Sequence, residues 1–200
     1  MELLLLSGGI DSACLAHWRR PKHAITIDYG QVCAKAEYEA SAHFCHLFGI
    51  KHHTVCLDTG MLGSGDLAGR PPHELAPESE WWPFRNQLLI TVAAIKAVSL
   101  RVDKILLGTV RSDSFHADGR VDFVSAVDRL LQLQEGNLEV EAPAIAMDSA
   151  TLVEESGIPF SHLGWAHSCH TNDLACGFCR GCYKHRDVME RLGVFKHGER

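Results

Sequence analysis

The sequence has no apolar run that approaches the roughly 20 residues needed to cross a lipid bilayer. No basic segment precedes the leucines near the N-terminus, and Gly8-Gly9 ends that apolar run too early for a secretory signal. The 13 histidines include no His-Glu-x-x-His or similar metal-binding set. The lack of a membrane-spanning run and of a secretory signal argues against a membrane-spanning or secreted protein. We therefore expect a cytoplasmic protein without membrane contacts.

An excess of positive charge is also missing, since 19 Lys and Arg stand against 25 Asp and Glu, a formal net charge of −6. Proteins that coat nucleic acid usually present a basic face, so we expect no nucleic-acid partner, although a local basic groove fits this composition. No internal repeat or low-complexity tract occurs. A length of 200 residues suits one domain with a small appendage, and a hydrophobic share of 46% allows a sizeable core.

A phosphate-binding loop is indicated by the run Leu6-Ser7-Gly8-Gly9-Ile10-Asp11-Ser12-Ala13. The apolar residues before it fit a short buried parallel strand, and residues 13–19 fit a helix that Asp11 and Ser12 open. The glycines let backbone N–H groups approach a ligand, and the start of a helix favours an anion. No Gly-Lys-Ser/Thr follows, so this is not a Walker loop. The alternative is an ordinary turn after a strand.

Strands and helices are expected to alternate along most of the chain. We expect strands at 23–28, 52–57 and 104–108, an extended segment at 139–147, and helices at 34–48, 87–100, 122–135 and 150–155. This order predicts an α/β fold with a Rossmann-like parallel sheet, whose ligands bind beyond the carboxyl ends of the strands. The loop after the first strand, Asp28 and Gly108 would lie there. Residues 59–83, rich in Gly and Pro, suit either a lid or a disordered insertion.

A metal site is indicated near the C-terminus by Cys169, Cys176, Cys179 and Cys182, spaced C-x6-C-x2-C-x2-C. Two residues between thiolates let a tight turn aim both sulfurs at one centre, and four sulfurs satisfy a tetrahedral Zn²⁺. We favour zinc in a structural role, with an iron–sulfur cluster and disulfides as alternatives. The expected organisation is an α/β domain with the phosphate-binding loop over residues 1–160 and a zinc-binding segment over residues 161–200.

The Ser-Gly-Gly-x-Asp-Ser motif resembles the PP-loop of the ATP-pyrophosphatase superfamily, whose members cleave ATP between its α and β phosphates. Over nearly the whole chain, the sequence is similar to the 7-cyano-7-deazaguanine synthases of queuosine biosynthesis. The matching motifs are Leu6–Ser12, Asp28-Tyr29-Gly30-Gln31, Pro83-x-Arg85-Asn86, Gly108, Asp118-x-Arg120-x-Asp122-Phe123, Ala142-Pro143 and the block Cys169–Cys182 followed by Arg186. The resemblance implies a PP-loop fold and conversion of 7-carboxy-7-deazaguanine and ammonia to the nitrile, with ATP, Mg²⁺ and Zn²⁺. It also implies that the chain can form a homodimer.

The resemblance also implies site residues. ATP would be bound by Leu6, Ser7, Gly8, Gly9, Ile10, Asp11, Ser12, Ala13, Asp28 and Gly108. The catalytic residues would be Ser7, Asp11, Ser12 and Arg85, with Asp11 capping its helix or reaching Mg²⁺ through water. The acid substrate would meet Gln31, Arg85, Asn86, Asp113, Asp118 and Arg120. The alternatives are a surface arginine with Asn86 as a helix cap, and a surface loop around residues 118–120.

The chain departs from the family pattern on the substrate side. Val32, Cys33 and Ala36 replace the family's Arg, His and Glu, and Ser149 stands near the position of a family lysine. ATP binding is therefore a firmer expectation than the identity of the acid that is activated. The acceptor is ammonia or another molecule, including a protein. The other hypotheses are a PP-loop tRNA-modifying enzyme and a nucleotide-binding module that has lost turnover.

Overall fold

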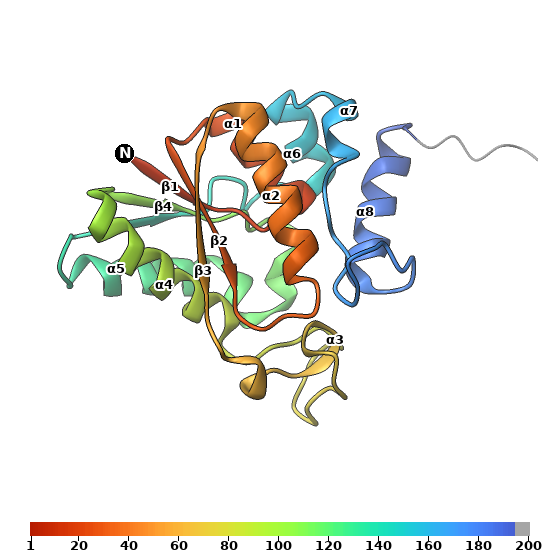
Figure 1. The fold of residues 1–200 in the computed structure, drawn as a ribbon, viewed down its shortest axis with the longest axis horizontal. Coiled ribbons are helices and arrows are strands. Elements are labelled where there is room, and N and C mark those ends of the chain that lie inside the picture. Colours follow the sequence, from red (N-terminus) through yellow and green to blue (C-terminus); the bar gives the residue numbers. More distant parts are fainter. Residues whose placement is uncertain (195–200) are drawn as a thin grey trace, which may run out of the picture.

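A five-stranded parallel sheet forms the centre of the computed structural model, which describes residues 1–194 (Figure 1). Its strand order is β3-β2-β1-β4-β5, with β1 (Glu2–Leu5) between β2 (His23–Asp28) and β4 (Lys104–Leu106). The strands at the edges are β3 (Lys51–Cys56) and β5 (Glu139–Glu141). Strands β2 and β3 are added on one side of β1, and β4 and β5 are then added on the other side. Ligands of such sheets bind where the direction changes, which here lies between β1 and β4.

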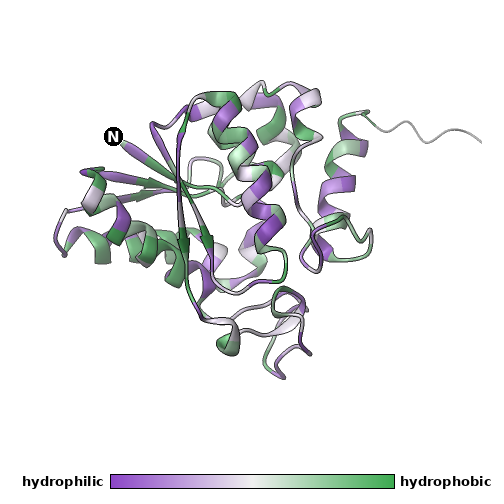
Figure 2. Cartoon of the chain, in the orientation of Figure 1, coloured by the Kyte–Doolittle hydropathy of each residue, from purple (hydrophilic) through white to green (hydrophobic). Residues whose placement is uncertain are grey.

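Helices cover both faces of the sheet. The α-helices are α1 (Ile10–Arg19), α2 (Ala34–Phe48), α3 (Gly65–Ala68), α4 (Arg85–Leu100), α5 (Val121–Gln132), α6 (Ser149–Ser156), α7 (Phe160–Leu163) and α8 (Arg180–Arg191). Leu3 of β1 packs in one core cluster with residues of α4 and α5, whereas Leu4 packs in another with residues of α1 and α2. Figure 2 shows α4 as mostly hydrophobic. Burial on both faces explains the apolar run Leu3-Leu4-Leu5 of β1, the central strand.

The expected α/β fold with a parallel sheet is confirmed, with changes at some element boundaries. Helix α1 begins at Ile10 rather than Ala13, because the Ala13 N–H already donates to the Gly9 carbonyl, 2.9 Å away. The 3₁₀ turns η1 (Gly60–Leu62), η2 (Arg111–Phe115) and η3 (Ala117–Gly119) and the helices α3, α7 and α8 were not expected. Helix α8 was missed because its sequence is highly polar and its start lies inside the cysteine motif.

Residues 59–83 form a compact segment against the carboxyl edge of the sheet. This segment contains η1 and α3, and it buries Leu67, Glu80 and Trp82. The indole of Trp82 meets Tyr29, which follows β2, with ring centroids 4.8 Å apart and an edge-on geometry. The segment therefore forms one wall of the region where ligands of this fold class bind.

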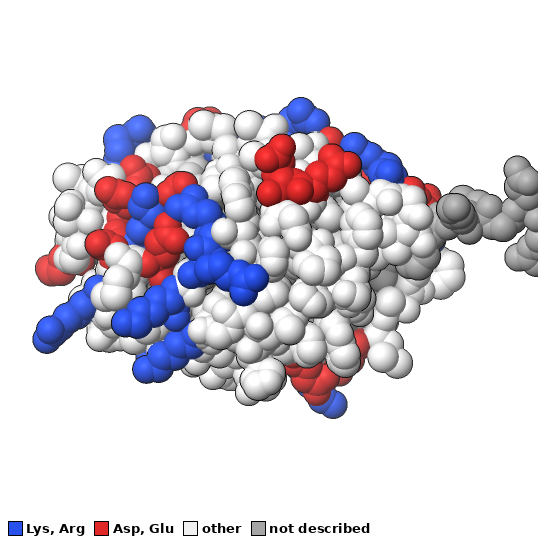
Figure 3. All heavy atoms as spheres, turned by 90° about the horizontal axis from the view of Figure 1, so that it is seen from above, with Lys and Arg blue, Asp and Glu red and all other residues white. Residues whose placement is uncertain are grey.

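The last part of the described chain shares a core with its first part. Val188 and Met189 of α8 pack in one cluster with Ile10 and Cys14 of α1 and Leu152 of α6. The division into residues 1–160 and 161–200 stays a prediction. On the face drawn in Figure 3, acidic and basic side chains are intermixed. Within residues 1–194, no helix is both long and apolar enough to cross a membrane.

Candidate functional site

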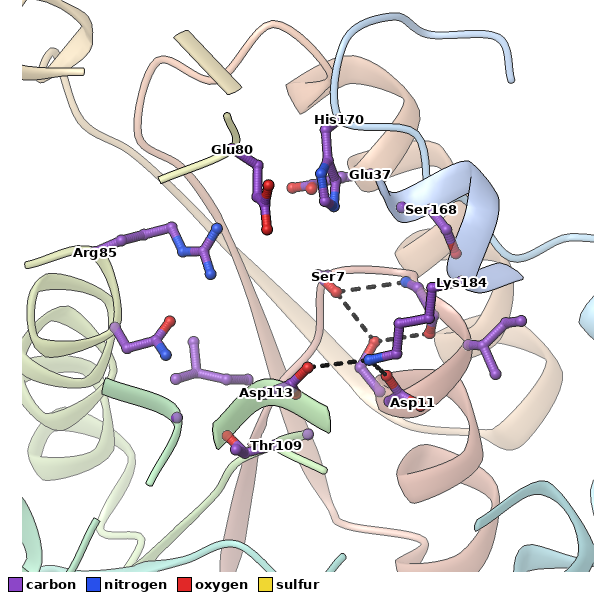
Figure 4. A pocket seen from close by; sticks show the side chains of 18 of the residues that line it. Ser7, Asp11, Glu37, Glu80, Arg85, Thr109, Asp113, Ser168, His170 and Lys184 are labelled. Atoms are coloured by element: carbon purple, nitrogen blue, oxygen red, sulfur yellow. Dashed lines mark hydrogen bonds and ion pairs between the residues drawn. The ribbon is translucent and has the colours of Figure 1, made fainter. Parts of the chain in front are cut away.

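A cavity of about 630 Å³ opens at the carboxyl ends of β1 and β4 (Figure 4). This volume is typical of a small-molecule site. Its lining includes most of the residues expected from the sequence to bind ATP or substrate, namely Leu6, Ser7, Gly9, Ile10, Asp11, Ser12, Arg85, Asn86, Gly108, Asp113 and Asp118. Residues far apart in the chain thus meet at the point where the sheet changes direction.

The loop between β1 and α1 is a tight turn with its polar groups at the cavity. Gly8 has φ +77°, a left-handed backbone conformation that favours glycine. The Ser7 Oγ lies 3.3 Å from the Ser12 Oγ, and the Ser12 hydroxyl donates to the Gly9 carbonyl at 3.1 Å. Gly108 follows β4 and packs against this turn, since a Cβ there would lie 3.3 Å from the Ser12 Cα. The start of α1, two hydroxyls and backbone N–H groups thus form a cradle suited to an anion.

Arg85 begins α4 on the opposite side of the cavity, and its guanidinium points into it (Figure 4). Burial works against its charged form, but Tyr29 and Asp118 nearby hold the pKa of Arg85 above its ordinary value. Within residues 1–194, no carboxylate forms an ion pair with it. A charged guanidinium in a cavity, without a carboxylate partner, has the chemistry that suits a carboxylate or phosphate ligand.

Asn86 and Asp118 hold the start of α4 in place. The Asp118 carboxylate accepts from the Asn86 backbone N–H at 3.2 Å, and the Asn86 amide donates to the Asp118 carbonyl at 3.0 Å. From the sequence, Asn86 was an alternative candidate for the cap of this helix. In the structure, the Asp118 carboxylate accepts a hydrogen bond from the first turn of the helix instead. Both residues also line the cavity.

Five of the expected site residues do not line the cavity: Gly8, Ala13, Asp28, Gln31 and Arg120. The Asp28 carboxylate accepts from the Gly30 N–H at 2.9 Å. Gln31 is buried and its amide donates to Glu37 at 2.7 Å. The Arg120 side chain is exposed and donates to the Ser114 carbonyl at 3.0 Å. The residues of this group with polar side chains therefore hold backbone turns or neighbouring side chains.

Glu37 lines the cavity and was not expected from the sequence. It lies on α2, one residue after Ala36, the position where the family pattern has a glutamate. Burial raises the pKa of its carboxyl to about 7, against the opposing effect of hydrogen bonds from Gln31 and Cys33. Within residues 1–194 it forms no ion pair. A cavity carboxyl that titrates near neutral pH can accept or release a proton.

The raised pKa of Glu37 predicts a pH-dependent stability. The folded chain holds the Glu37 proton up to about pH 7, whereas the unfolded chain releases it near the ordinary glutamate pKa of 4.5. Stability is therefore lost as pH rises from about 4.5 to 7. We expect Glu37→Gln to match the wild type at pH 4 and to be about 1–3 kcal/mol more stable at pH 8. Urea unfolding at both pH values measures this difference.

Glu39→Gln is the matched control for that experiment, because Glu39 is exposed on the same helix. We expect its unfolding free energy to differ from that of the wild type by less than about 0.5 kcal/mol at either pH. The prediction is contradicted if the difference in unfolding free energy between Glu37→Gln and the wild type is the same at pH 4 and pH 8.

A second acidic group, Glu80, joins the 59–83 segment to the rest of the site. Its Oε1 lies 3.0 Å from His116 Nε2 and 2.9 Å from the Arg180 guanidinium. Burial alone would raise its pKa, but the hydrogen bond from His116 and the charge of Arg180 lower the pKa of Glu80 to about 2. Glu80 stays ionised at neutral pH. It joins the 59–83 segment to His116, which lies between η2 and η3, and to Arg180 of α8.

Lys184 of α8 was also not expected, and it reaches the phosphate-binding loop (Figure 4). Its Nζ lies 2.8 Å from Asp11 Oδ2 and 3.0 Å from Asp113 Oδ1. Ser149, near the family's lysine position, also lines the cavity, and its buried hydroxyl has no partner within the described chain. The amine at this site is therefore that of Lys184 on α8, a helix that is distant in sequence from the loop.

The four cysteines converge as the spacing predicts. Their Sγ atoms all lie within 4.8 Å of one another, with Cys176 to Cys182 at 3.8 Å and Cys169 to Cys179 at 3.9 Å. All four thiols are free, and these distances are far longer than a disulfide bond. Backbone N–H groups of His170, Phe178, Cys179 and Cys182 donate to the sulfurs, as expected for thiolates. The cluster can hold a metal ion.

The residues that were missed had weak or no local signals. Arg180 follows Cys179, and Lys184 comes two residues after Cys182. Predicting a helix that begins at the cysteine cluster would have placed both side chains near the site. Glu37 stands one position away from a family glutamate. Glu80 and His170 lie in segments without periodicity, and the sequence carries no sign that they meet at one cavity.

Comparison with known proteins agrees with this site. A family model described as "Queuosine biosynthesis protein QueC" matches residues 1–193. A 7-cyano-7-deazaguanine synthase from Desulforudis audaxviator is 33% identical, covering 90% of this chain and 92% of that protein. Another from Methanothermobacter thermautotrophicus is 31% identical, covering 95% and 94%.

Two solved structures share the fold at low sequence identity. The U34-tRNA thiolase NcsA from Methanococcus maripaludis, with its [4Fe-4S] cluster, aligns with a TM-score of 0.52 at 16% identity, over 98% of this chain and 66% of that one. A predicted subunit of tRNA methyltransferase from Methanocaldococcus jannaschii aligns with a TM-score of 0.50 at 17% identity, over 96% and 89%. These likenesses concern the fold alone. The family model, the two synthases and the site described above agree, and the chain belongs to the QueC family of queuosine biosynthesis proteins.

Proposed function

We propose that this protein is an ATP-dependent ligase that converts 7-carboxy-7-deazaguanine and ammonia to 7-cyano-7-deazaguanine, with release of AMP and pyrophosphate. A carboxylate oxygen of the acid attacks the α-phosphorus of ATP, and pyrophosphate leaves. Ammonia then adds to the acyl carbon and AMP departs, which gives the amide. A second ATP activates the amide oxygen in the same way, with release of pyrophosphate. Loss of AMP and of both protons of the amide nitrogen then forms the nitrile.

One observation carries this proposal: a single cavity joins the loop at residues 7–12 to the guanidinium of Arg85. The loop suits the phosphates of ATP, and Arg85 suits the carboxylate of the acid. Adenylation brings these two anions together, so the protein mainly has to position them and neutralise their charge. Both tasks match the groups that line the cavity.

The other lining residues have consistent roles in this proposal. Ser7, Ser12 and the backbone N–H groups of the loop hold the departing pyrophosphate. Asp11, whose buried Oδ1 has no partner within the described chain, is suited to orient Mg²⁺ through water. Mg²⁺ supplies charge neutralisation on the phosphates when bound. The titrating carboxyl of Glu37 is available to take the proton that ammonia loses as it forms the amide.

For the cysteine cluster we propose a single Zn²⁺. A tetrahedral site with Zn–S bonds of about 2.3 Å has sulfurs about 3.8 Å apart. Two of the Sγ pairs lie 3.8 and 3.9 Å apart, and all four Sγ atoms lie within 4.8 Å of one another. A four-iron cluster separates its thiolates further, because a cube of iron and sulfide lies between them. We expect elemental analysis to find one zinc per chain and no acid-labile sulfide. Several irons per chain would contradict the assignment.

The reaction is tested by incubating purified protein with ATP, Mg²⁺, ammonia and 7-carboxy-7-deazaguanine, and by measuring AMP and the nitrile by mass spectrometry. Two AMP per nitrile is the expected result. AMP without nitrile would point to another acceptor in place of ammonia. AMP formed only with a different acid would change the substrate, and absence of AMP with every acid would overturn the proposal.

A further inference from the structure

Phosphate binding at the loop requires positive charge. ATP brings about four negative charges at neutral pH, and Asp11 of the loop adds another. The loop itself offers hydroxyls and N–H dipoles but no cation. Within the described chain, three Lys or Arg side chains line the cavity: Arg85, Arg180 and Lys184.

Two of these three cations are placed for other tasks. Arg180 pairs with the buried Glu80 at 2.9 Å, and its guanidinium also lies over the Phe115 ring, 5.0 Å from the centroid. Arg85 lies on α4, across the cavity from the loop (Figure 4). Lys184 is the one that forms an ion pair with a loop residue, Asp11.

The amine of Lys184 has donor capacity left over. An ammonium group carries three N–H donors, and Asp11 and Asp113 accept two, at 2.8 and 3.0 Å. Figure 4 shows the amine between Asp11 and Asp113, and Lys184 lines the same cavity as Ser7. The third N–H is therefore available to an oxygen of a ligand held by the loop.

The cysteine cluster adjoins the start of the helix that carries this amine. Helix α8 begins directly after Cys179 and contains Cys182, so two of the four thiolates bracket its first turn. Gly181 in that turn is pressed against residue 168, since a Cβ there would lie 1.8 Å from the Ser168 carbonyl oxygen. The next residue back, His167, donates its backbone N–H to the Gly8 carbonyl at 2.9 Å. The cysteine segment thus contacts the phosphate-binding loop directly.

We propose that Lys184 is the cation that binds the phosphate chain of ATP at the loop of residues 7–12, and that the metal bound by the four cysteines holds Lys184 in that position. The two ends of the chain then form one nucleotide site. The proposal rests on the ATP binding assigned under the proposed function, but not on the identity of the acid or of its acceptor.

The test uses the full chain with its metal, and calorimetric titration with two probes, Mg²⁺-ATP and adenosine. Loss of one charge-assisted hydrogen bond costs about 1.5–3 kcal/mol, or about 10–100-fold in affinity. We expect Lys184→Met to weaken ATP binding by this factor and to leave adenosine binding within about twofold. Lys184→Arg, which keeps the charge, should recover most of the loss. Lys35→Met, on the exposed face of α2, is the matched control.

Removal of the metal with a chelator tests the second half of the proposal. We expect stripped wild-type protein to lose ATP affinity at least as strongly as Lys184→Met, with α/β circular dichroism retained. Stripping Lys184→Met should weaken ATP binding much less than stripping the wild type, because the positioned amine is already gone. Stripped protein that binds ATP normally would overturn the metal's role.

Two results with the variants would overturn the role of Lys184. One is unchanged ATP affinity in Lys184→Met, and the other is an equal loss of ATP and adenosine affinity, which indicates general damage to the fold. Failure of the proposed function would give a different result. A protein that binds ATP through Lys184 but forms no nitrile would contradict the proposed reaction and still support the role of Lys184.

Discussion

Replacing Arg85 by methionine is expected to reduce AMP release with the acid substrate by about 10³-fold or more, with the fold unchanged. The guanidinium points into the cavity without a carboxylate partner, so the variant creates no unpaired buried carboxylate. Under the proposed function, the variant loses the bidentate, charge-assisted contact between Arg85 and the carboxylate that attacks ATP. A loss of about 4 kcal/mol of transition-state stabilisation corresponds to a factor of about 10³. Steady-state AMP production, followed at saturating ATP, measures it.

Arg129→Met is the matched control, because Arg129 is exposed on α5 and does not line the cavity. Arg85→Lys is informative as well: it keeps the charge but loses the planar fork, so we expect intermediate activity and a raised KM for the acid. An Arg85→Met enzyme within tenfold of the wild type would place the carboxylate elsewhere in the cavity.

Replacing Gly8 by alanine is expected to have the largest effect on the fold and on nucleotide binding together. Gly8 has φ +77°, and a Cβ there would lie 2.7 Å from the Ala40 Cβ, 3.0 Å from the Glu37 carbonyl oxygen and 3.1 Å from the Ser41 nitrogen. These atoms belong to α2, so the loop has to move away from that helix. We expect a loss of about 3 kcal/mol or more in unfolding free energy and of more than about 100-fold in ATP affinity.

Gly157→Ala separates backbone strain from steric conflict. Gly157 also has a positive φ, +63°, but a Cβ added there would meet nothing within 4 Å. The strain alone should cost about 1 kcal/mol, without an effect on ATP binding. Urea unfolding and calorimetry on both variants give the comparison, and equal effects at Gly8 and Gly157 would disprove the close packing of the loop on α2.

Local patterns in the sequence were enough for the fold class and for both ends of the site. The strand–turn–helix run around Ser-Gly-Gly-Ile-Asp-Ser identifies the anion cradle, because strand burial, turn glycines and a helix start are all encoded within about ten residues. The cysteine spacing identifies the metal cluster for the same reason. Arg85 and Asn86 were found only through resemblance to a family, since nothing in their neighbours says what they face.

The departures from the family pattern had a different outcome in three dimensions. The sequence suggested the loss of a glutamate at Ala36 and of a lysine near Ser149. The fold brings Glu37 and Lys184 to the same cavity. Glu37 lies one position after Ala36 on α2, and Lys184 lies on α8, a helix that was not expected. Conversely, Arg120 matches a family motif, but its side chain is exposed and donates to a loop carbonyl.

By itself, the sequence determined the parallel α/β architecture, the loop at residues 7–12 and the four-cysteine cluster, because each depends on residues close together in the chain. Only the tertiary structure decided which charges meet: Lys184 with Asp11 and Asp113, Glu80 with Arg180, and Arg85 opposite the loop. These pairs are up to 173 positions apart (184 minus 11). Contacts at such separations depend on strand order and on the docking of α8, which no local pattern encodes.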